Sequence, residues 1–175
     1  PGDLQPSHFP HLADATVMIT GAGGSLGRAL AMRLATSGVQ RLVLVGRGAS
    51  ALELTRREIA ALPARAFGDV SAPDVVPRIA DVTDRDAMES LFTAYHPQVV
   101  FHLAAVSSAQ LVEVQPEEGV RTNIIGTATV AWLAHAARVK RFVLVSCGRA
   151  ASPVSVLGAS KRVAERGMFA LASQS

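Results

Sequence analysis

Residues 17–30 read VMITGAGGSLGRAL, an apolar run that meets glycines at Gly21, Gly24 and Gly27 and continues as an apolar stripe with helical spacing. This order predicts a buried strand, a phosphate-binding loop and a helix. Glycines permit the tight turn and let the backbone approach a pyrophosphate, whose charge is stabilised by unpaired N–H groups and the positive end of the helix dipole. A glycine-rich turn can also be only a turn, but the strand before it and the helix after it favour a dinucleotide site.

The composition fits one domain built around a buried sheet. The chain has 175 residues, 49% of them hydrophobic, which is enough for a sheet covered on both faces. The formal net charge is +3, and the basic residues are scattered along the chain. Since a nucleic-acid site needs clustered positive charge, no nucleic-acid partner is expected.

Cysteine usage and hydropathy indicate the compartment. Cys147 is the one cysteine and cannot form an internal disulfide, and no apolar run approaches the roughly 18 residues that would span a bilayer. We therefore expect a cytoplasmic protein without a membrane span. No set of histidine, cysteine and carboxylate side chains has metal-ligand spacing, so no metal is expected. The proline-containing residues 1–11 are expected to be a linker or the remnant of a longer chain, and residues 12–175 to be the dinucleotide-binding domain.

Strands alternate with helices along the chain. Five apolar segments are predicted to be strands, at residues 17–19, 41–45, 78–82, 98–104 and 141–146. The third is placed after Pro77 because proline interrupts the apolar run before it. Predicted helices include one that begins at a capping box of Ser50 and Glu53, one that is capped by Thr83 and Asp86, and a long one over 116–137. This alternation predicts an α/β fold with a doubly wound parallel sheet of the Rossmann type and ligands at the carboxyl ends of the strands.

Several motifs, together covering nearly the whole chain, resemble those of the extended short-chain dehydrogenases. They are TGAGGSLG at 20–27, LVLVGRG at 42–48, ADV at 80–82, VVFHLAA at 99–105, RTNIIGT at 121–127 and RFVLVS at 141–146. Within that superfamily the chain is most similar to the capsular polysaccharide-biosynthesis branch, which comprises nucleotide-sugar 4,6-dehydratases and epimerases. The run LGASKR at 157–162 stands where that branch carries Tyr/Met-Gly-Ala-Thr-Lys.

The resemblance implies a nicotinamide-dinucleotide site and assigns residues to it. The glycine-rich loop would hold the pyrophosphate with Gly21, Gly23, Gly24, Ser25 and Leu26. The other contacts implied are Asp81 and Val82 at the adenine, Ala104 and Ala105 at the nicotinamide-side ribose, and Asn123 near that ribose. The resemblance also implies a nucleotide-sugar substrate and homo-oligomers paired through helices at 84–95 and 116–137. The C-terminal substrate lobe that clasps the sugar in such enzymes is expected to be missing from this chain.

The end of the second predicted strand indicates which dinucleotide binds. An acidic residue there would accept the ribose hydroxyls of NAD, whereas this chain has Gly46 followed by Arg47. A guanidinium matches a 2′-phosphate with two charge-assisted hydrogen bonds, so NADP is the predicted cofactor. The alternative is that Arg47 is only a solvated loop residue.

The expected catalytic residues depart from the family pattern. Hydride chemistry in this fold needs an acid–base group, normally a tyrosine whose pKa is lowered by a lysine four residues later. Here Lys161 is present, but Leu157 occupies the tyrosine position. Some members of the branch use a Thr-Asp-Lys triplet after the fifth strand, where this chain has Cys147-Gly148-Arg149. The candidate catalytic residues are therefore Lys161, which would orient the nicotinamide ribose, and Arg149, which stays charged near neutral pH.

Other reactive side chains have simpler interpretations. Cys147 has no obvious activating histidine and is interpreted as a small packing residue. His102 in an apolar strand and His135 on a helix are interpreted as structural. Trp132 and Met88 are interpreted as packing residues and not as parts of a binding box. The family's Lys-His pair after the fourth strand is replaced by Ser107-Ser108, which removes an expected substrate contact.

Three functions fit these patterns. The first is an NADP-dependent enzyme of nucleotide-sugar metabolism, or its cofactor-binding half, that oxidises the sugar transiently at C4. The second is a catalytically inactive NADP-binding module that senses the cofactor or serves as a scaffold, as Gly148 and Leu157 suggest. The third is a ketoreductase-like domain of a multidomain synthase, which the segments at 123–127 and 158–162 disfavour relative to the sugar branch.

Overall fold

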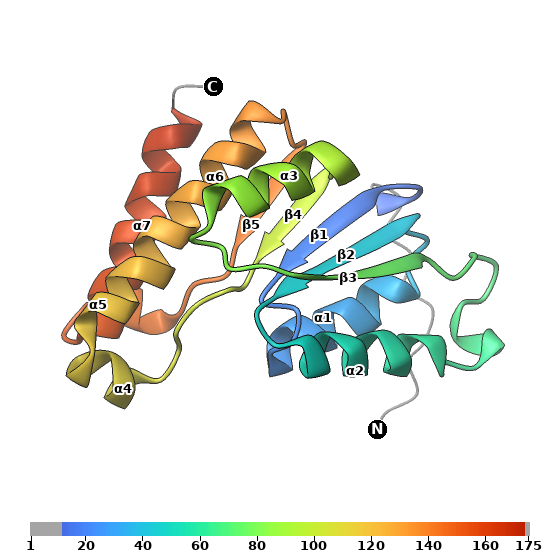
Figure 1. Cartoon of the computed structure of the whole chain (residues 1–175), viewed down its shortest axis with the longest axis horizontal. Helices are drawn as coiled ribbons and strands as arrows, with labels where there is room; N and C mark the ends of the chain where they lie inside the picture. The colour runs from blue at the N-terminus through green and yellow to red at the C-terminus, as the bar shows by residue number, and fades with distance from the viewer. Residues whose placement is uncertain (1–11, 174–175) are drawn as a thin grey trace.

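Five parallel strands form the sheet that the sequence predicts, in the order β3-β2-β1-β4-β5 (Figure 1). The computed structural model describes residues 12–173, so the linker predicted at 1–11 lies outside the described part. The strands are β1 (Thr16–Thr20), β2 (Arg41–Gly46), β3 (Asp74–Ile79), β4 (Val99–His102) and β5 (Arg141–Leu144). β1 is central and pairs with β2 on one side and β4 on the other. The strand order therefore reverses beside β1, which is where this class of fold binds its ligands.

Helices cover both faces of the sheet (Figure 1). Side chains of α1 (Ser25–Ala35) and α2 (Ala49–Ala60) pack with Val17, Ile19 and Leu42 on one face. Side chains of α3 (Arg85–Tyr95) and α6 (Thr127–Ala136) pack with Met18, Val43 and Val100 on the other. Successive strand residues point to opposite faces, so an unbroken apolar strand such as β2 needs a helical layer on each side.

β3 lies four residues earlier than predicted and contains Pro77. The predicted strand was 78–82, whereas the observed one is Asp74–Ile79. β3 is an edge strand that pairs only with β2. Because one side of an edge strand makes no ladder hydrogen bonds, a residue without an N–H group is tolerated there. The prediction was wrong because it treated proline as a strand breaker in every position.

Two predicted helix starts also differ from the structure. α2 begins after Gly48, with no side-chain cap, so the predicted capping box of Ser50 and Glu53 is absent. Glu53 instead accepts hydrogen bonds from Arg56 and Arg57, which lower its pKa to about 2. At α3 the cap is Asp84, whose carboxylate accepts from the N–H of Ala87, and neither Thr83 nor Asp86 has that role.

The long helix predicted over 116–137 is helical throughout but not uniform. It comprises α5 (Pro116–Glu118), a π-helical segment η3 (Gly119–Gly126) and α6, and a short unpredicted helix α4 (Ala109–Val114) precedes it. π-Helical turns are rare and occur frequently at functional sites. The chain then forms β5, a 3₁₀ turn η4 (Gly148–Ala150) and α7 (Val156–Ala172). Among residues 12–173 there is no helix with the length and apolar character needed to cross a bilayer.

Candidate functional site

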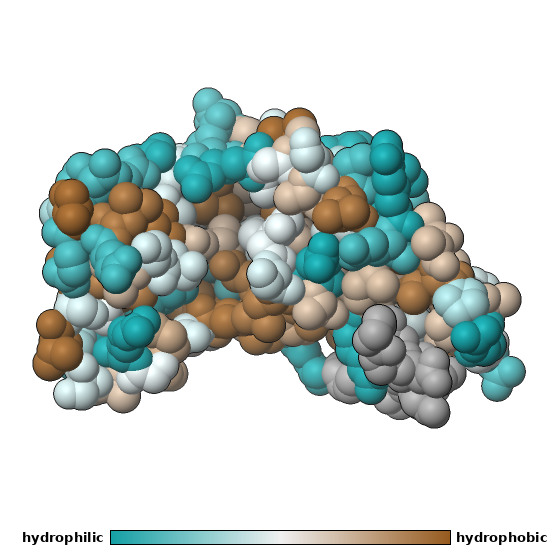
Figure 2. All heavy atoms as spheres, turned by 90° about the horizontal axis from the view of Figure 1, so that it is seen from below, coloured by the Kyte–Doolittle hydropathy of each residue, from teal (hydrophilic) through white to brown (hydrophobic). Residues whose placement is uncertain are grey.

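A cavity of about 570 Å³ opens at the carboxyl ends of the strands. Figure 2 views the molecule from below and shows apolar side chains gathered along the hollow in the middle of that face. Eleven of the thirteen residues predicted for the site line the cavity: Gly21, Gly24, Ser25, Leu26, Arg47, Asp81, Val82, Ala104, Ala105, Arg149 and Lys161. Six separate segments of the sequence are thus brought together, because parallel strands present all their carboxyl ends at one edge of the sheet.

The glycine-rich turn makes the closest backbone approaches in the site. Gly21 has φ +73°, and a Cβ atom there would lie 2.7 Å from the backbone nitrogen of Ala104. A Cβ at Gly27 would lie 2.3 Å from the carbonyl oxygen of Gly21. The turn is followed by α1, whose first turn has no side-chain cap. The first three residues of α1, Ser25, Leu26 and Gly27, line the cavity, so the N-terminus of this helix is placed where an anionic ligand could use its N–H groups.

Gly23 has a different position from its neighbours. It is not among the residues that line the cavity. A Cβ atom there would lie 2.9 Å from the Cβ of Ala51 on α2. The structure thus assigns Gly23 to the contact between the loop and α2, whereas the resemblance assigns it to the pyrophosphate.

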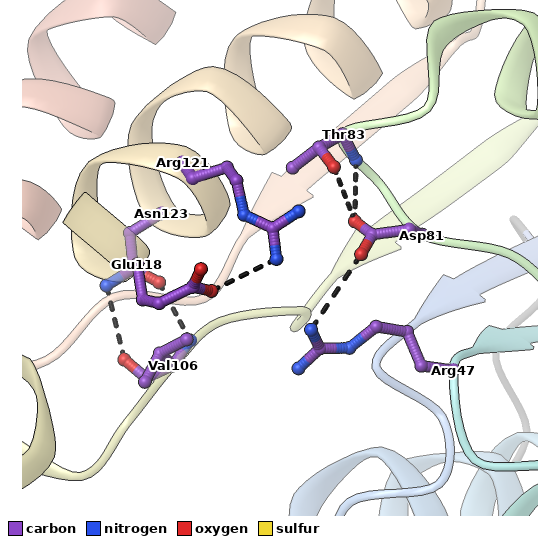
Figure 3. Close-up of polar contacts among 7 residues, drawn as sticks. All are labelled: Arg47, Asp81, Thr83, Val106, Glu118, Arg121 and Asn123. Carbon is purple, nitrogen blue, oxygen red and sulfur yellow. Dashed lines mark hydrogen bonds and ion pairs between the residues drawn. The ribbon is translucent and has the colours of Figure 1, made fainter. Parts of the chain in front are cut away.

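Arg47 and Asp81 form the charged rim of the cavity (Figure 3). The Arg47 guanidinium lies 3.8 Å from the Asp81 carboxylate, and its side chain is 60% exposed. Asp81 also accepts hydrogen bonds from the backbone N–H (2.9 Å) and hydroxyl (2.8 Å) of Thr83. Partial burial acts to raise the pKa of Asp81, but the hydrogen bonds from Thr83 and the charges of Arg47 and Arg121 outweigh it, so the pKa lies below its ordinary value.

Asn123 supports the site from behind. It is fully buried, and its side chain holds the loop after β4 through both backbone groups of Val106 (Figure 3). Oδ1 accepts from the Val106 N–H at 2.9 Å, while Nδ2 donates to the Val106 carbonyl at 3.2 Å and to the hydroxyl of Ser160 at 3.0 Å. Asn123 is not among the residues that line the cavity. Its amide groups are used to connect η3, the loop after β4 and α7, so a direct contact with ribose is not what this geometry offers.

The opposite end of the cavity holds the candidate catalytic residues. Lys161 is 8% exposed and donates from Nζ to the carbonyl oxygen of Val145 at 3.2 Å. Burial lowers its pKa, partly opposed by Cys147 and Glu165. Leu157 and Arg149 line the same end. A Cβ at Gly148 would meet no atom within 4 Å, so the loop has room for the aspartate that the family carries there.

Ten further residues line the cavity although they were not predicted as site residues. They are Gly27, Gly46, Ala80, Leu103, Ser107, Thr122, Val145, Ser146, Cys147 and Leu157. Five of them stand next to a predicted residue in the sequence, so adjacency was the available signal for Gly27, Gly46, Ala80, Leu103 and Thr122. The hydroxyl oxygens of Thr122 and Ser146 are buried and have no hydrogen-bond partner, which no sequence pattern indicates.

His102, Met88 and Trp132 make packing and hydrogen-bond contacts. His102 is buried and hydrogen-bonds to Thr20 through Nδ1 (2.7 Å) and to Thr127 through Nε2 (3.0 Å), as a structural histidine should. Burial and the charge of Lys161 lower its pKa to about 3. Met88 is fully buried, whereas Trp132 is 46% exposed and packs against the guanidinium of Arg85, which lies 4.2 Å from the ring centroid.

Comparison with known proteins gives the chain its relatives. The family described as "Polysaccharide biosynthesis protein" matches residues 17–175. The capsular polysaccharide biosynthesis protein CapD of Staphylococcus aureus is 33% identical over 154 residues, which are 88% of this chain and 25% of CapD. The probable polysaccharide biosynthesis protein EpsC of Bacillus subtilis is 39% identical over 150 residues, 86% of this chain and 24% of EpsC. The chain thus spans about a quarter of the length of these two relatives.

Solved structures share the fold. Pen from Bacillus thuringiensis superposes with a TM-score of 0.80 at 27% identity, and the match covers 91% of this chain and 45% of the Pen chain. A second solved structure is the UDP-glucose 4-epimerase of Stenotrophomonas maltophila with bound NAD and formylated UDP-arabinopyranose. It has a TM-score of 0.75 at 25% identity, and the match covers 91% of this chain and 49% of the epimerase chain. The match over residues 17–175 and the shared Rossmann architecture lead to one conclusion: the chain belongs to the polysaccharide biosynthesis protein family of extended short-chain dehydrogenases.

Proposed function

We propose that this chain is the NADP-binding domain of a nucleotide-sugar dehydratase- or epimerase-like protein of polysaccharide biosynthesis, with an incomplete catalytic set. The observation that carries the cofactor part is the position of Arg47. It follows β2 at the rim of the glycine-lined cavity, where NAD-dependent enzymes of this fold place an acidic residue. The lining of the cavity also suits such a cofactor, because a few charged side chains lie among mostly apolar residues.

The charges around Arg47 support a 2′-phosphate. Arg47 is only 3.8 Å from Asp81 and mostly exposed, so this ion pair is weak and can be exchanged for a stronger partner. Arg121 points toward the same space (Figure 3) and acts electrostatically on Asp81. Arg121 is itself paired with Glu118 at 3.0 Å, so Arg47, whose contact with Asp81 is the longer one, is the cation at this end that can turn to a new anion. A phosphate dianion would gain charge-assisted hydrogen bonds there.

Calorimetric titration with NADPH and NADH tests this part. Wild-type protein is expected to bind NADPH more tightly, and Arg47→Ala to weaken NADPH about tenfold, consistent with the 1.5–3 kcal/mol typical of hydrogen bonds to charged groups after allowance for exposure. NADH affinity should change less than about twofold. Arg65→Ala is the matched control, because Arg65 is exposed in the 3₁₀ turn before β3 and is not among the residues that line the cavity. Equal affinity for both dinucleotides, or equal weakening of both by Arg47→Ala, contradicts the assignment to NADP.

The residues at the Lys161 end of the cavity support the part of the proposal that concerns an incomplete catalytic set. A 4,6-dehydratase or epimerase needs a group that accepts the proton from the sugar hydroxyl while hydride passes to the nicotinamide. Leu157 has no proton to exchange, and Gly148 has no side chain. Among the described lining residues, Lys161 and Arg149 are the cationic side chains at this end. Lys161 would orient the cofactor ribose, and Arg149 would attract an anionic group of the substrate.

A catalytically inactive sensor or scaffold is the second candidate function, and the same two positions favour it. The protein should be incubated with NADP and a panel of UDP- and dTDP-sugars, and sugar conversion should be followed by NMR. The inactive module predicts no conversion by wild type. The double variant Gly148→Asp with Leu157→Tyr should gain conversion if the rest of the site is intact, and the room at Gly148 makes the first substitution compatible with the fold. Turnover by wild type would refute the inactive module and show that other residues move the protons.

A further inference from the structure

The charged residues that line the cavity are distributed unevenly between its two ends. They are Arg47, Asp81, Arg149 and Lys161. Arg47 and Asp81 follow β2 and β3 in the chain and lie 3.8 Å from each other. Arg149 and Lys161 follow β5, which is the opposite edge of the sheet from β3. The Lys161 end of the cavity therefore has two cations and, among the described lining residues, no carboxylate.

Arg149 is the cation at this end whose side chain is not engaged. Lys161 is buried, and its ammonium group donates a hydrogen bond to the carbonyl oxygen of Val145. Arg149 is exposed, and its guanidinium forms no ion pair with any carboxylate of residues 12–173. Because no existing pair has to be broken, this guanidinium can bind an anionic ligand with two parallel charge-assisted hydrogen bonds.

The 3₁₀ turn η4 holds the backbone of Arg149 against α7. A backbone hydrogen bond from the N–H of Ala150 to the carbonyl oxygen of Cys147 closes the turn. The carbonyl oxygen of Arg149 lies so close to α7 that a Cβ atom at Gly158 would be 2.6 Å from it. Gly158 stands three residues before Lys161, in the first turn of the helix. The main chain thus fixes Arg149 beside the part of α7 that lines the cavity.

The space beside Arg149 is open and contains a hydroxyl group that the protein does not use. A Cβ atom at Gly148 would meet no atom within 4 Å. The hydroxyl oxygen of Ser146, which also lines the cavity, is buried and has no hydrogen-bond partner. Buried hydroxyls are nearly always paired with protein, water or ligand, because an unpaired one is unfavourable. This end of the cavity therefore offers a cation and a hydroxyl donor to a ligand with negatively charged acceptors.

We infer that the sugar bound at this end carries a carboxylate, as in a nucleotide-linked uronic acid, and that Arg149 binds this carboxylate. The inference rests on the proposed nucleotide-sugar function and names its substrate class. A planar guanidinium matches the two oxygens of a carboxylate, whereas the hydroxymethyl group of a neutral sugar has no charge to offer it. An aspartate at position 148 would repel a sugar carboxylate, and this chain has glycine there.

Cys147 can report on an anion site at this end, because it is the one cysteine of the chain, is half-buried and lines the cavity. The rates of its alkylation by iodoacetate and by neutral iodoacetamide are measured by mass spectrometry. The ratio of the two rates is compared between the folded protein and the same protein unfolded in urea, where the cavity is absent. Arg149→Gln is the test variant. Arg166→Gln is the matched control, since it removes the same charge from an exposed position of α7 outside the cavity lining.

The rate ratio of iodoacetate to iodoacetamide should be at least about fivefold higher in the folded than in the unfolded protein, for wild type and for Arg166→Gln. Charge-assisted hydrogen bonds to Arg149 would concentrate the carboxylate reagent beside the thiol to about that extent. Arg149→Gln should lie within about twofold of its unfolded value. A wild-type ratio that is not raised, or one that Arg149→Gln leaves raised, overturns the inference. A folded protein that neither reagent modifies also overturns it, because a site closed to iodoacetate cannot hold a sugar carboxylate.

Protection of Cys147 by nucleotides distinguishes a sugar carboxylate from the diphosphate as the bound anion. With NADP present, UDP-glucuronic acid, UDP-glucose and UDP are compared by the concentration that halves the rate of alkylation by iodoacetamide. UDP-glucuronic acid should protect at about fivefold lower concentration than UDP-glucose, and Arg149→Gln should remove this difference. Equal protection by the two sugar nucleotides overturns the inference, and equal weakening of both and of UDP by Arg149→Gln would assign Arg149 to the diphosphate. If no nucleotide protects, the proposed nucleotide-sugar function fails and the uronic acid assignment with it, whatever the iodoacetate ratio shows of the anion site.

Discussion

Gly24 and Gly27 both belong to the glycine pattern of the loop before α1, yet the structure predicts different effects on stability when each is replaced by alanine. At Gly27 a Cβ atom would lie 2.3, 2.8 and 2.9 Å from three backbone atoms of Gly21 and Ala22. At Gly24 the nearest approach of a Cβ atom is 3.4 Å, to the carbonyl oxygen of Gly21. Backbone atoms cannot move aside as a flexible side chain can. Gly27→Ala should therefore strain the fold, and Gly24→Ala should leave it nearly intact.

The size of each effect follows from these distances. Overpacking typically destabilises by about 1–3 kcal/mol and occasionally more, and the higher helix propensity of alanine returns about 1 kcal/mol. We expect a net loss of about 2 kcal/mol for Gly27→Ala. Gly24 is the N-cap of α1, where alanine is less favourable than glycine by about 0.5 kcal/mol. With a urea dependence of about 2 kcal/mol per molar, the unfolding midpoints should fall by about 1 M and about 0.3 M.

Gly24→Ala should affect ligand binding more than it affects stability. Gly24 is exposed and lines the cavity, so its new methyl group would occupy the space through which the pyrophosphate approaches the backbone. Gly24→Ala should bind NADPH at least about tenfold more weakly while remaining folded by circular dichroism. The reasoning is refuted if Gly27→Ala unfolds at the wild-type urea concentration, or if Gly24→Ala is the less stable of the two variants.

Three other predictions concern the support of the site and its assembly. Asn123→Leu leaves both backbone groups of Val106 without their partner and should lower the free energy of unfolding by about 2–4 kcal/mol in urea titration; an unchanged midpoint would exclude a supporting role. The pKa of His102 is about 3 in the folded protein and about 6.5 in the unfolded chain, so the unfolded chain takes up the proton first as the pH falls. The stability that neutral His102 contributes is therefore complete above about pH 6.5 and is lost as the pH falls toward 3. Between pH 7 and pH 5 wild type should lose about 2 kcal/mol more than His102→Gln, and parallel pH profiles would contradict the assignment. The homo-oligomer remains a prediction, and light scattering should give a multiple of the monomer mass, whereas a monomer at all concentrations would refute it.

The sequence predicted the architecture because the relevant signals are local. A short apolar run followed by turn residues and a helical stripe identifies each strand–helix unit, and parallel order follows from their alternation. Pro77 misled the placement of β3 because its tolerance depends on which strand lies at the edge of the sheet. Ser50 and Glu53 matched a capping box, but Glu53 has arginines three and four residues later that bind its carboxylate.

The sequence by itself determined the doubly wound fold, the glycine-rich loop and most of the residues that line the cavity, because these depend on spacing within single motifs. Only the tertiary structure decided how individual residues within a motif are used. Gly23 packs on α2, Asn123 holds the loop after β4, and Thr122 lines the cavity. The π-helical turn and the contacts between η3, the loop after β3 and α7 join segments that are far apart in the chain, and no local pattern records which neighbour each side chain will meet.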